Sequence, residues 1–322
     1  AASDVYKRQG LAYSIQSFLC NAGSLVGFLF PFIFTWIGIS NIAPQGVVPD
    51  SVIYSFYIGA AILILCVIYT TVKVKEMPPA EYAEYHGITE EEEKEKINMV
   101  KLLIKAPKAF WTVGLVQFFC WFAFMFMWTY TNGSVAANVF DAPTVETAVN
   151  GVSKVMLDTK SIQYQDAADW VGVLFAVQAI GSVLWAVCIP LFKDRKLIYS
   201  LSLVLGGLGF ISTYFVHNQY VLFISFLLIG CAWAAMLALP FTILTNALSG
   251  GHMGTYLGLF NGTICIPQIV AASLGGSILA LFTPKGMLPP EINMLVMAGV
   301  MLIIGAVCVY LIKETKGEQT KA

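Results

Sequence analysis

Long apolar runs separated by short polar stretches dominate the chain, and residues 110–140 form the most aromatic of these runs. More than twenty successive residues there carry no charge, and as a helix they would cross about 30 Å of hydrocarbon. At about 100° per residue, the larger polar and aromatic side chains fall within one sector of that helix, and Tyr130 falls on the opposite side. The members of the sector are Gln117, Trp121, Phe124, Trp128, Thr131 and Asn132. A lipid-facing anchor does not need such a face, so the helix is predicted to be one wall of a solute pathway.

The same apolar pattern predicts eight membrane-spanning helices in an all-α fold. Their predicted bounds are 11–38, 52–72, 110–132, 170–192, 197–216, 220–246, 256–282 and 292–312. The composition agrees, because only 11% of the residues are charged and 58% are hydrophobic, whereas a soluble domain carries about 25% charged residues. The chain is therefore expected to be a polytopic membrane protein.

The basic residues predict the orientation of these spans. Most Lys and Arg residues lie in three connections, 73–109, 193–196 and 313–322, which share one side if the spans alternate. The positive-inside rule makes that side cytoplasmic, so both chain ends are expected in the cytoplasm of a bacterial-type inner (plasma) membrane. Residues 96–108 could form an amphipathic surface helix, although a charged linker without its own function is the simpler interpretation. On the opposite side, the loop before residue 170 is expected to be partly helical near 145–156.

Charged chemistry is scarce inside the predicted spans. Their interiors contain no Asp, Glu, Lys, Arg or His, which argues against a proton or ion relay built on a buried charge in these helices. The seven cysteines lie in apolar runs without a CxxC motif, and the three histidines are scattered. We therefore expect no metal site, no cofactor and no enzymatic activity. The net charge of −1 gives no electrostatic reason to expect nucleic acid as a partner.

Uncharged polar side chains are more informative. The run 11–38 contains Gln16 and Asn21, the run 170–192 places Gln178 on a face with Ser182 and Trp185, and the run 256–282 places Asn261 and Gln268 on one face. Carboxamides donate and accept hydrogen bonds, and an indole offers a flat apolar face, so together they suit a sugar. Bonds between helices are an equally good explanation for any single amide, although such pairs average only about 0.6 kcal/mol in membranes. Their recurrence on several helices favours a pathway.

Two prolines lie in the middle of predicted spans. Pro240 and Pro267 each remove a backbone hydrogen bond and free the carbonyl four residues earlier, at Met236 and Thr263. Interrupted helices near the membrane midplane are typical of transporter sites and hinges. A kink that neighbouring helices satisfy is the alternative.

Three stretches resemble the major facilitator superfamily. They are CWFAFMFMWTYT (120–131), GCAWAAMLALPFTILTNAL (230–248) and MGTYLGLFNGTICIPQI (253–269). The closest resemblance is to its sucrose/maltose–proton symporter-like members, which are related to the glycoside–pentoside–hexuronide cation symporters. It covers nearly all of residues 10–315 and is more specific for the superfamily than for the substrate.

The resemblance implies helices five to twelve of a twelve-helix fold with alternating access. Residues 1–9 do not fit it and are interpreted as a non-native leader. Residues 10–73 would be the last two helices of the N-terminal bundle, 74–109 the central cytoplasmic linker, 110–315 the C-terminal six-helix bundle and 316–322 a cytoplasmic tail. The implied substrate-binding residues are Gln16, Asn21, Gln117, Trp121, Trp128, Gln178, Trp233, Asn261 and Gln268.

Hinge or gating roles are implied for four further residues, Pro240, Pro267, Asp194 and Arg195. The last two lie in a turn that resembles a degraded copy of the superfamily's D-R-x-G-R-R gating loop, without its glycine and later arginines. Positive-inside anchoring is the better explanation of that turn.

The resemblance implies proton-coupled (cation) symport of a sugar or glycoside by a monomer in the lipid bilayer. The first four helices and the coupling acid expected in them are missing from this sequence, so coupled transport by the fragment alone is not expected. The same fold could instead carry a nucleoside, peptide or drug, or act as a non-transporting membrane sensor. A membrane enzyme is disfavoured because the spans lack a buried acid, base or metal cluster.

Overall fold

A computed structural model describes residues 2–39, 48–75, 78, 81, 99–149, 152–192, 194–248 and 253–312. Most of these residues are helical, and two short strands form the remaining regular structure. The helices are α1 (Ala2–Trp36), α2 (Asp50–Lys73), α5 (Met99–Ile104), α6 (Lys108–Asn138), α7 (Ile162–Cys188), η1 (Ile189–Leu191), α8 (Arg195–Ser212), α9 (Leu222–Ala247), α10 (Met253–Phe260), α11 (Gly262–Phe282), α12 (Ile292–Cys308) and η2 (Val309–Leu311). The strands are β1 (Thr144–Val149) and β2 (Val152–Leu157).

Seven helices within the described ranges are long and apolar enough to cross a membrane. They match the predicted spans from residue 52 onward, with α10 and α11 forming one span of Gly254–Phe282. The first predicted span lies in α1, where the apolar stretch Phe18–Phe30 is shorter than the length required of the other seven. The eighth span and its place in a twelve-helix fold therefore remain predictions. Helix α1 already begins at Ala2, so no helix end separates residues 2–9 from the following sequence.

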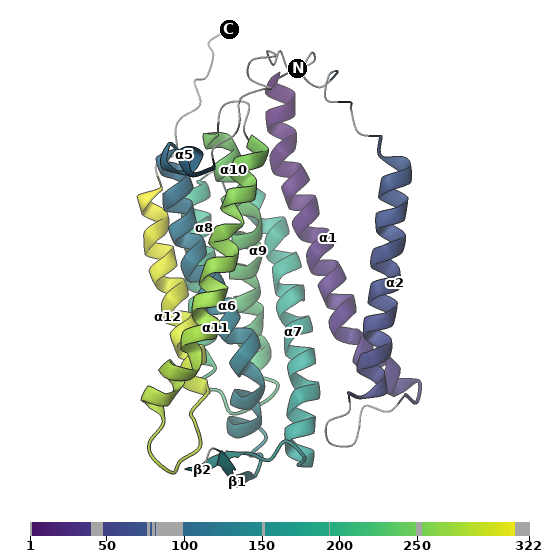
Figure 1. Ribbon diagram of the computed structural model, residues 1–322, viewed down its shortest axis with the longest axis vertical. Coiled ribbons are helices and arrows are strands. Elements are labelled where there is room, and N and C mark those ends of the chain that lie inside the picture. The colour runs from purple at the N-terminus through teal and green to yellow at the C-terminus, as the bar shows by residue number, and fades with distance from the viewer. Residues whose placement is uncertain are drawn as a thin grey trace.

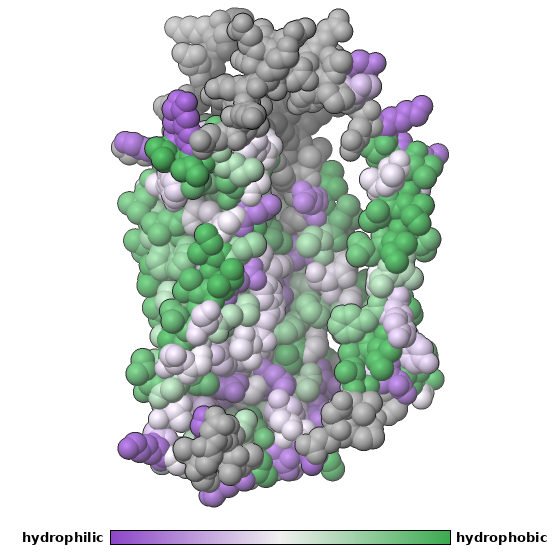
Figure 2. Space-filling view, viewed as in Figure 1, coloured by the Kyte–Doolittle hydropathy of each residue, from purple (hydrophilic) through white to green (hydrophobic). Residues whose placement is uncertain are grey.

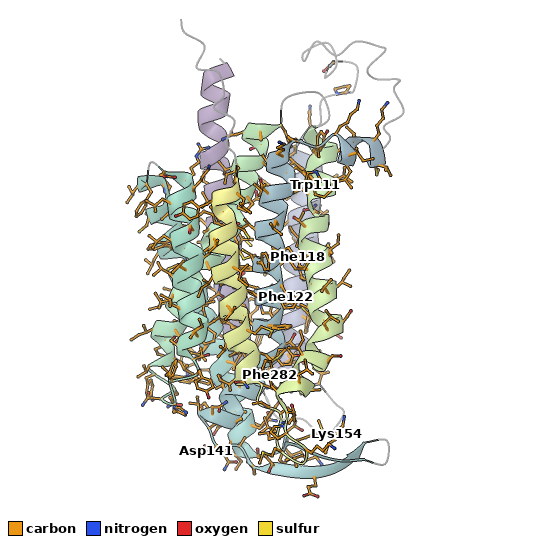
Figure 3. The ribbon with its side chains drawn as sticks, turned by 90° about the vertical axis from the view of Figure 1, so that its left-hand side faces the viewer. Trp111, Phe118, Phe122, Asp141, Lys154 and Phe282 are labelled. Carbon is orange, nitrogen blue, oxygen red and sulfur yellow. The ribbon has the colours of Figure 1, made fainter. Side chains whose placement is uncertain are left out.

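The helices from α6 to α12 form one bundle around α6 (Figure 1). Helix α6 packs against α12 and α11, and its side chains Phe124, Phe126 and Met127 are fully buried. Figure 3 shows Phe118 and Phe122 following α6 down the interior of the bundle. Helix α1 lies against α7 and α9, whereas α2 contacts α1 and leaves most of its apolar side chains exposed. The aromatic run that predicted a pathway wall thus forms the central helix.

Glycines set the closest helix contacts, above all between α7 and α9. A Cβ atom added at Gly181 of α7 would lie 2.6 Å from the backbone oxygen of Leu227 in α9. One added at Gly230 of α9 would lie 2.7 Å from the backbone nitrogen of Ser182 and would also meet the backbone oxygen of Gln178. Only hydrogen fits at these positions, so the two backbones touch and hold Gln178 close to α9.

The loop before α7 corrects one prediction. Residues 145–156 were expected to be partly helical, but β1 and β2 form an antiparallel pair in which Thr144 faces Leu157. The strands are rich in Val and Thr, whose branched side chains favour extended backbone. The sequence between them is Asn-Gly, the strongest short hairpin signal. The fold is therefore mostly helical rather than strictly all-α, and the end of the bundle beside these strands is called the hairpin end below.

The opposite end of the bundle carries α5, which covers only part of the amphipathic helix predicted for residues 96–108. Within that range, Met99–Ile104 are helical and lie across the end of the bundle (Figure 1). The hydroxyl of Tyr256 in α10 donates a hydrogen bond of 3.4 Å to the carbonyl of Leu102. Helix α5 is thereby attached to α10, at the end opposite to the strands.

Candidate solute site

A cavity of about 120 Å³ lies among α1, α6, α7 and α9. Its lining combines amide, hydroxyl, aromatic and thioether side chains: Asn21, Ser24, Phe28, Met127, Trp128, Gln178, Ala179 and Trp233. Four of the nine residues implied to bind substrate therefore meet at one place, and they come from four different helices. The predicted polar faces of α6 and α7 both reach this cavity, whereas Asn261 and Gln268 of the third predicted face do not line it.

Three indoles gather beside this cavity. The ring centroid of Trp233 on α9 lies 5.7 Å from that of Trp121 and 5.8 Å from that of Trp128, and the two α6 indoles are 6.4 Å apart. Phe124 packs against Trp233 at 4.8 Å, which supports the cluster from behind. Trp121 is buried, but Trp128 remains 41% exposed. The cluster therefore packs against the Trp128 indole while leaving part of that ring accessible.

Hydrogen-bond donors accompany the indoles. Gln178 is 4% exposed, and its Nε2 group donates to no other group in the described part of the chain. The indole nitrogen of Trp121 is likewise buried without an acceptor there. A buried hydrogen-bond donor that has no acceptor costs about 1–3 kcal/mol of stability. A hydroxylated or carbonyl-bearing molecule in the cavity could accept a hydrogen bond from the Gln178 amide and remove that cost.

Gln117 bonds a neighbouring helix, the alternative that the sequence left open for any single amide. It is fully buried between α6 and α9, and its Nε2 donates a hydrogen bond of 3.3 Å to the carbonyl of Met236. That carbonyl is the one that Pro240 frees, because proline has no N–H to bond it. Helix α9 continues through Pro240, and Gln117 of the neighbouring helix α6 satisfies the freed carbonyl. Gln117 does not line the indole cavity, and the interhelical explanation fits it best.

We predict that Gln117 and Pro240 are energetically coupled. Gln117→Leu should destabilise the protein by about 1 kcal/mol, because the Met236 carbonyl loses its donor. In a Pro240→Ala background the restored N–H can bond Met236 within the helix, and the same Leu substitution should then cost less than half as much. Unfolding of the four variants in detergent gives the coupling free energy. Equal costs in both backgrounds would contradict the pairing.

The remaining implied binding residues lie away from the indole cavity. Gln16 is exposed on α1, Asn261 is exposed between α10 and α11, and Gln268 is half-buried on α11. Pro267 is buried inside α11, but the short interruption of this helix falls at Asn261 rather than four residues before the proline. Figure 2 shows pale and purple residues gathering down the middle of one face, between apolar flanks. The described structure thus brings only part of the implied set together.

Asp194 and Arg195 begin helix α8, and their local geometry explains their presence. The Asp194 carboxylate accepts hydrogen bonds of 2.9 Å from the N–H of Lys196 and 3.1 Å from the N–H of Leu197. This is an N-cap, which satisfies backbone donors that a helix start leaves open. Arg195 is the first residue of α8. A gating role for the pair stays a prediction, and Lys193 of the same turn lies outside the described residues.

A second cavity was not predicted from the apolar spans. It measures about 280 Å³ at the hairpin end and is lined by Asn132, Gly133, Tyr164 and Glu291, among others. Burial raises the pKa of Glu291 to about 7. Glu291 immediately precedes α12 and lies outside its spanning segment. Charges were considered only within the span interiors, so Glu291 was not predicted as a site residue. Its position one residue before an uncharged helix was a usable signal.

The fold and the indole cavity define a polytopic membrane protein with an indole- and amide-lined space between its helices. Residues 135–322, more than half of the chain, match the sequence profile of the Major Facilitator Superfamily, and the chain belongs to that superfamily. It is therefore a membrane transporter for a small-molecule solute rather than an enzyme, and it works in a lipid environment. No curated protein matches the chain.

Proposed function

We propose that the protein carries a sugar or glycoside by proton (cation) symport, with alternating access, and that the indole cavity is part of its solute site. The described helices would then be helices five to twelve of a twelve-helix transporter, with both ends of this chain in the cytoplasm of a bacterial-type inner membrane. The transporter would act as a monomer. The resemblance of residues 120–131, 230–248 and 253–269 to sucrose/maltose–proton symporters supports this proposal.

The observation that carries the proposal is the accessible indole of Trp128 beside the buried amide of Gln178. A sugar ring has C–H faces, which stack on an indole, and hydroxyl edges, which bond amides. The cavity of about 120 Å³ is smaller than the roughly 300 Å³ at which typical ligand pockets begin. Binding of a whole sugar therefore requires α1 to move away from α7 and α9. That movement is the kind of opening that alternating access supplies.

Sugar binding should depend on Trp128 but not on Trp111. Trp128→Ala is expected to weaken sucrose or maltose binding about 3- to 10-fold, the value of an aromatic contact of 0.5–1.5 kcal/mol. Trp111 lies on the same helix, is 52% exposed and is absent from the cavity lining, so Trp111→Ala is the matched control. Binding is measured with the purified chain by calorimetric titration of each sugar.

Equal affinities in both tryptophan variants would remove the indole cavity from the solute site. Other cargo is tested by the same titration with a nucleoside, a dipeptide and an aromatic drug. Tight binding of one of these, with no binding of sucrose or maltose, would overturn the sugar assignment and leave the transporter fold intact. Binding of sugar without proton-dependent uptake by the transporter with all its helices would favour the sensor alternative.

A further inference from the structure

The hairpin-end cavity is separate from the indole cavity and contains a carboxyl group that has no cationic partner among the described residues. Its lining from α6 is Thr129, Asn132 and Gly133, and the start of α12 adds Glu291. Its lining, within the described ranges, includes no Lys, Arg or His. A carboxylate that loses water without gaining a positive partner is costly, so the composition of this cavity needs an explanation.

Glu291 is seated in the cavity by close packing on α6. A Cβ atom added at Gly133 would collide with both oxygens and the carboxyl carbon of Glu291. The carboxyl group therefore lies directly on the α6 backbone, where any larger residue would displace it. This close approach places the carboxyl group at the α6 wall of the cavity.

Asn132 faces the same space with its orientation fixed. Its Nδ2 donates a hydrogen bond of 2.9 Å to the hydroxyl of Tyr164 on α7. Its Oδ1 is buried and accepts no hydrogen bond from the described residues. The cavity thus combines a carboxylate with an amide oxygen that lacks a donor, and both require a ligand rich in hydrogen-bond donors.

We propose that Glu291, Asn132 and Tyr164 form a binding site for a small monovalent organic ammonium at the hairpin end of the bundle. One carboxylate balances one positive charge, and an ammonium supplies three donors for the carboxylate, the amide oxygen and the phenol oxygen. No group of three metal-ligating acids, cysteines or histidines occurs among the described residues, which disfavours a divalent metal. The volume of about 280 Å³ exceeds that of a bare ion and accommodates a short carbon chain.

Protons compete with the ligand at this site. Burial raises the pKa of Glu291 to about 7, so the carboxylate needed for binding is present above pH 7 and is lost as the pH falls below it. In the described part of the chain, the titratable groups found beside Glu291 are Tyr130 of α6 and Tyr164 of α7. The hairpin contributes the neutral Met156 and Leu157 to the lining. The pH dependence of binding should therefore follow one carboxyl group.

The test is calorimetric titration of n-propylammonium chloride into the purified full chain, in a buffer without other amines. Binding should be about 100-fold weaker at pH 5 than at pH 8, the ratio for a single proton competing at a group of pKa about 7. Sodium chloride and the neutral analogue n-propanol should not compete at equal concentration. Glu291→Gln should weaken binding at pH 8 by about 100-fold, because it removes the compensating charge.

Two further variants separate the site from general effects of charge and folding. Glu146→Gln removes an exposed acid on β1 that is absent from the cavity lining, and it should leave binding unchanged. Gly133→Ala keeps every charge but displaces Glu291, and it should weaken binding at least 10-fold while the helical circular dichroism is retained. Binding that is independent of pH, unaltered in Glu291→Gln, or equally strong for n-propanol or sodium would overturn the proposal. Its outcome is independent of the sugar titrations, which concern other residues.

Discussion

Gly230→Ala is expected to destabilise the protein by about 2–3 kcal/mol, at the upper end of the range for an overpacked site. The added methyl group would meet the backbone oxygen of Gln178 and, at 2.7 Å, the backbone nitrogen of Ser182. Backbone atoms within a helix cannot rotate away as a side chain can, so α7 and α9 must separate. The midpoint of unfolding in a denaturing-detergent titration would report the loss.

The same substitution should also disturb the indole cavity. Gln178 belongs to α7, whereas Trp233 belongs to α9, and both line the cavity. Separating these helices moves the amide away from the indole, and we therefore expect sugar affinity to fall together with stability. Trp128 on α6 is not displaced directly, so the loss of affinity should be partial rather than complete.

Gly258→Ala is the matched control for Gly230→Ala. Gly258 lies in α10 and is exposed. Apart from its own helix backbone, no described atom lies within 4 Å of a Cβ atom added there. Alanine is the better helix former by about 0.8–1 kcal/mol, so this variant should be as stable as the original protein or more so. If both glycine variants lost the same stability, tight packing between α7 and α9 would not be the cause.

The membrane spans were predictable because length and apolarity are properties of a single segment. Helices α6, α7, α8, α9 and α12 all coincide with apolar runs, and the errors are mainly at their ends. Helix α7 begins at Ile162, eight residues before the predicted start, because Ser161 caps it by accepting a hydrogen bond from the N–H of Tyr164. Its first two turns contain acids and amides, which an apolarity criterion excludes. The hairpin was missed for a related reason, since its alternating pattern is shorter than any span.

The residues of the site were predictable only where their position on a single helix face determines their contacts. Helical spacing placed Trp121 and Trp128 in one sector, and both join the indole cluster. Spacing placed Gln117 in the same sector, but its partner Met236 lies 119 residues away in the sequence. The sequence showed a free carbonyl and a buried amide without showing that they meet. Glu291 lies one residue outside the apolar segment, and its contact with Gly133 of another helix cannot be read from the sequence.

Stability should fall as the pH rises from about 4.5 to about 7, because Glu291 is buried. Burial raises its pKa from 4.5 to about 7, and a carboxyl group with a raised folded-state pKa stabilises the protein while it stays protonated. That contribution is complete below pH 4.5 and is lost as the pH rises through 7. A shift of this size corresponds to at most about 3 kcal/mol at 1.36 kcal/mol per pH unit.

Glu291→Gln isolates this effect because glutamine keeps the shape and never ionises. The difference in unfolding free energy between the two proteins should change by about 3 kcal/mol between pH 4.5 and pH 8, with the original protein losing stability. Other groups titrate equally in both proteins and cancel in the difference. Glu146→Gln, on the exposed face of β1, should show no such change. A pH-independent difference would mean that Glu291 ionises freely in water, and its carboxyl could not then be the buried charge of the hairpin-end cavity.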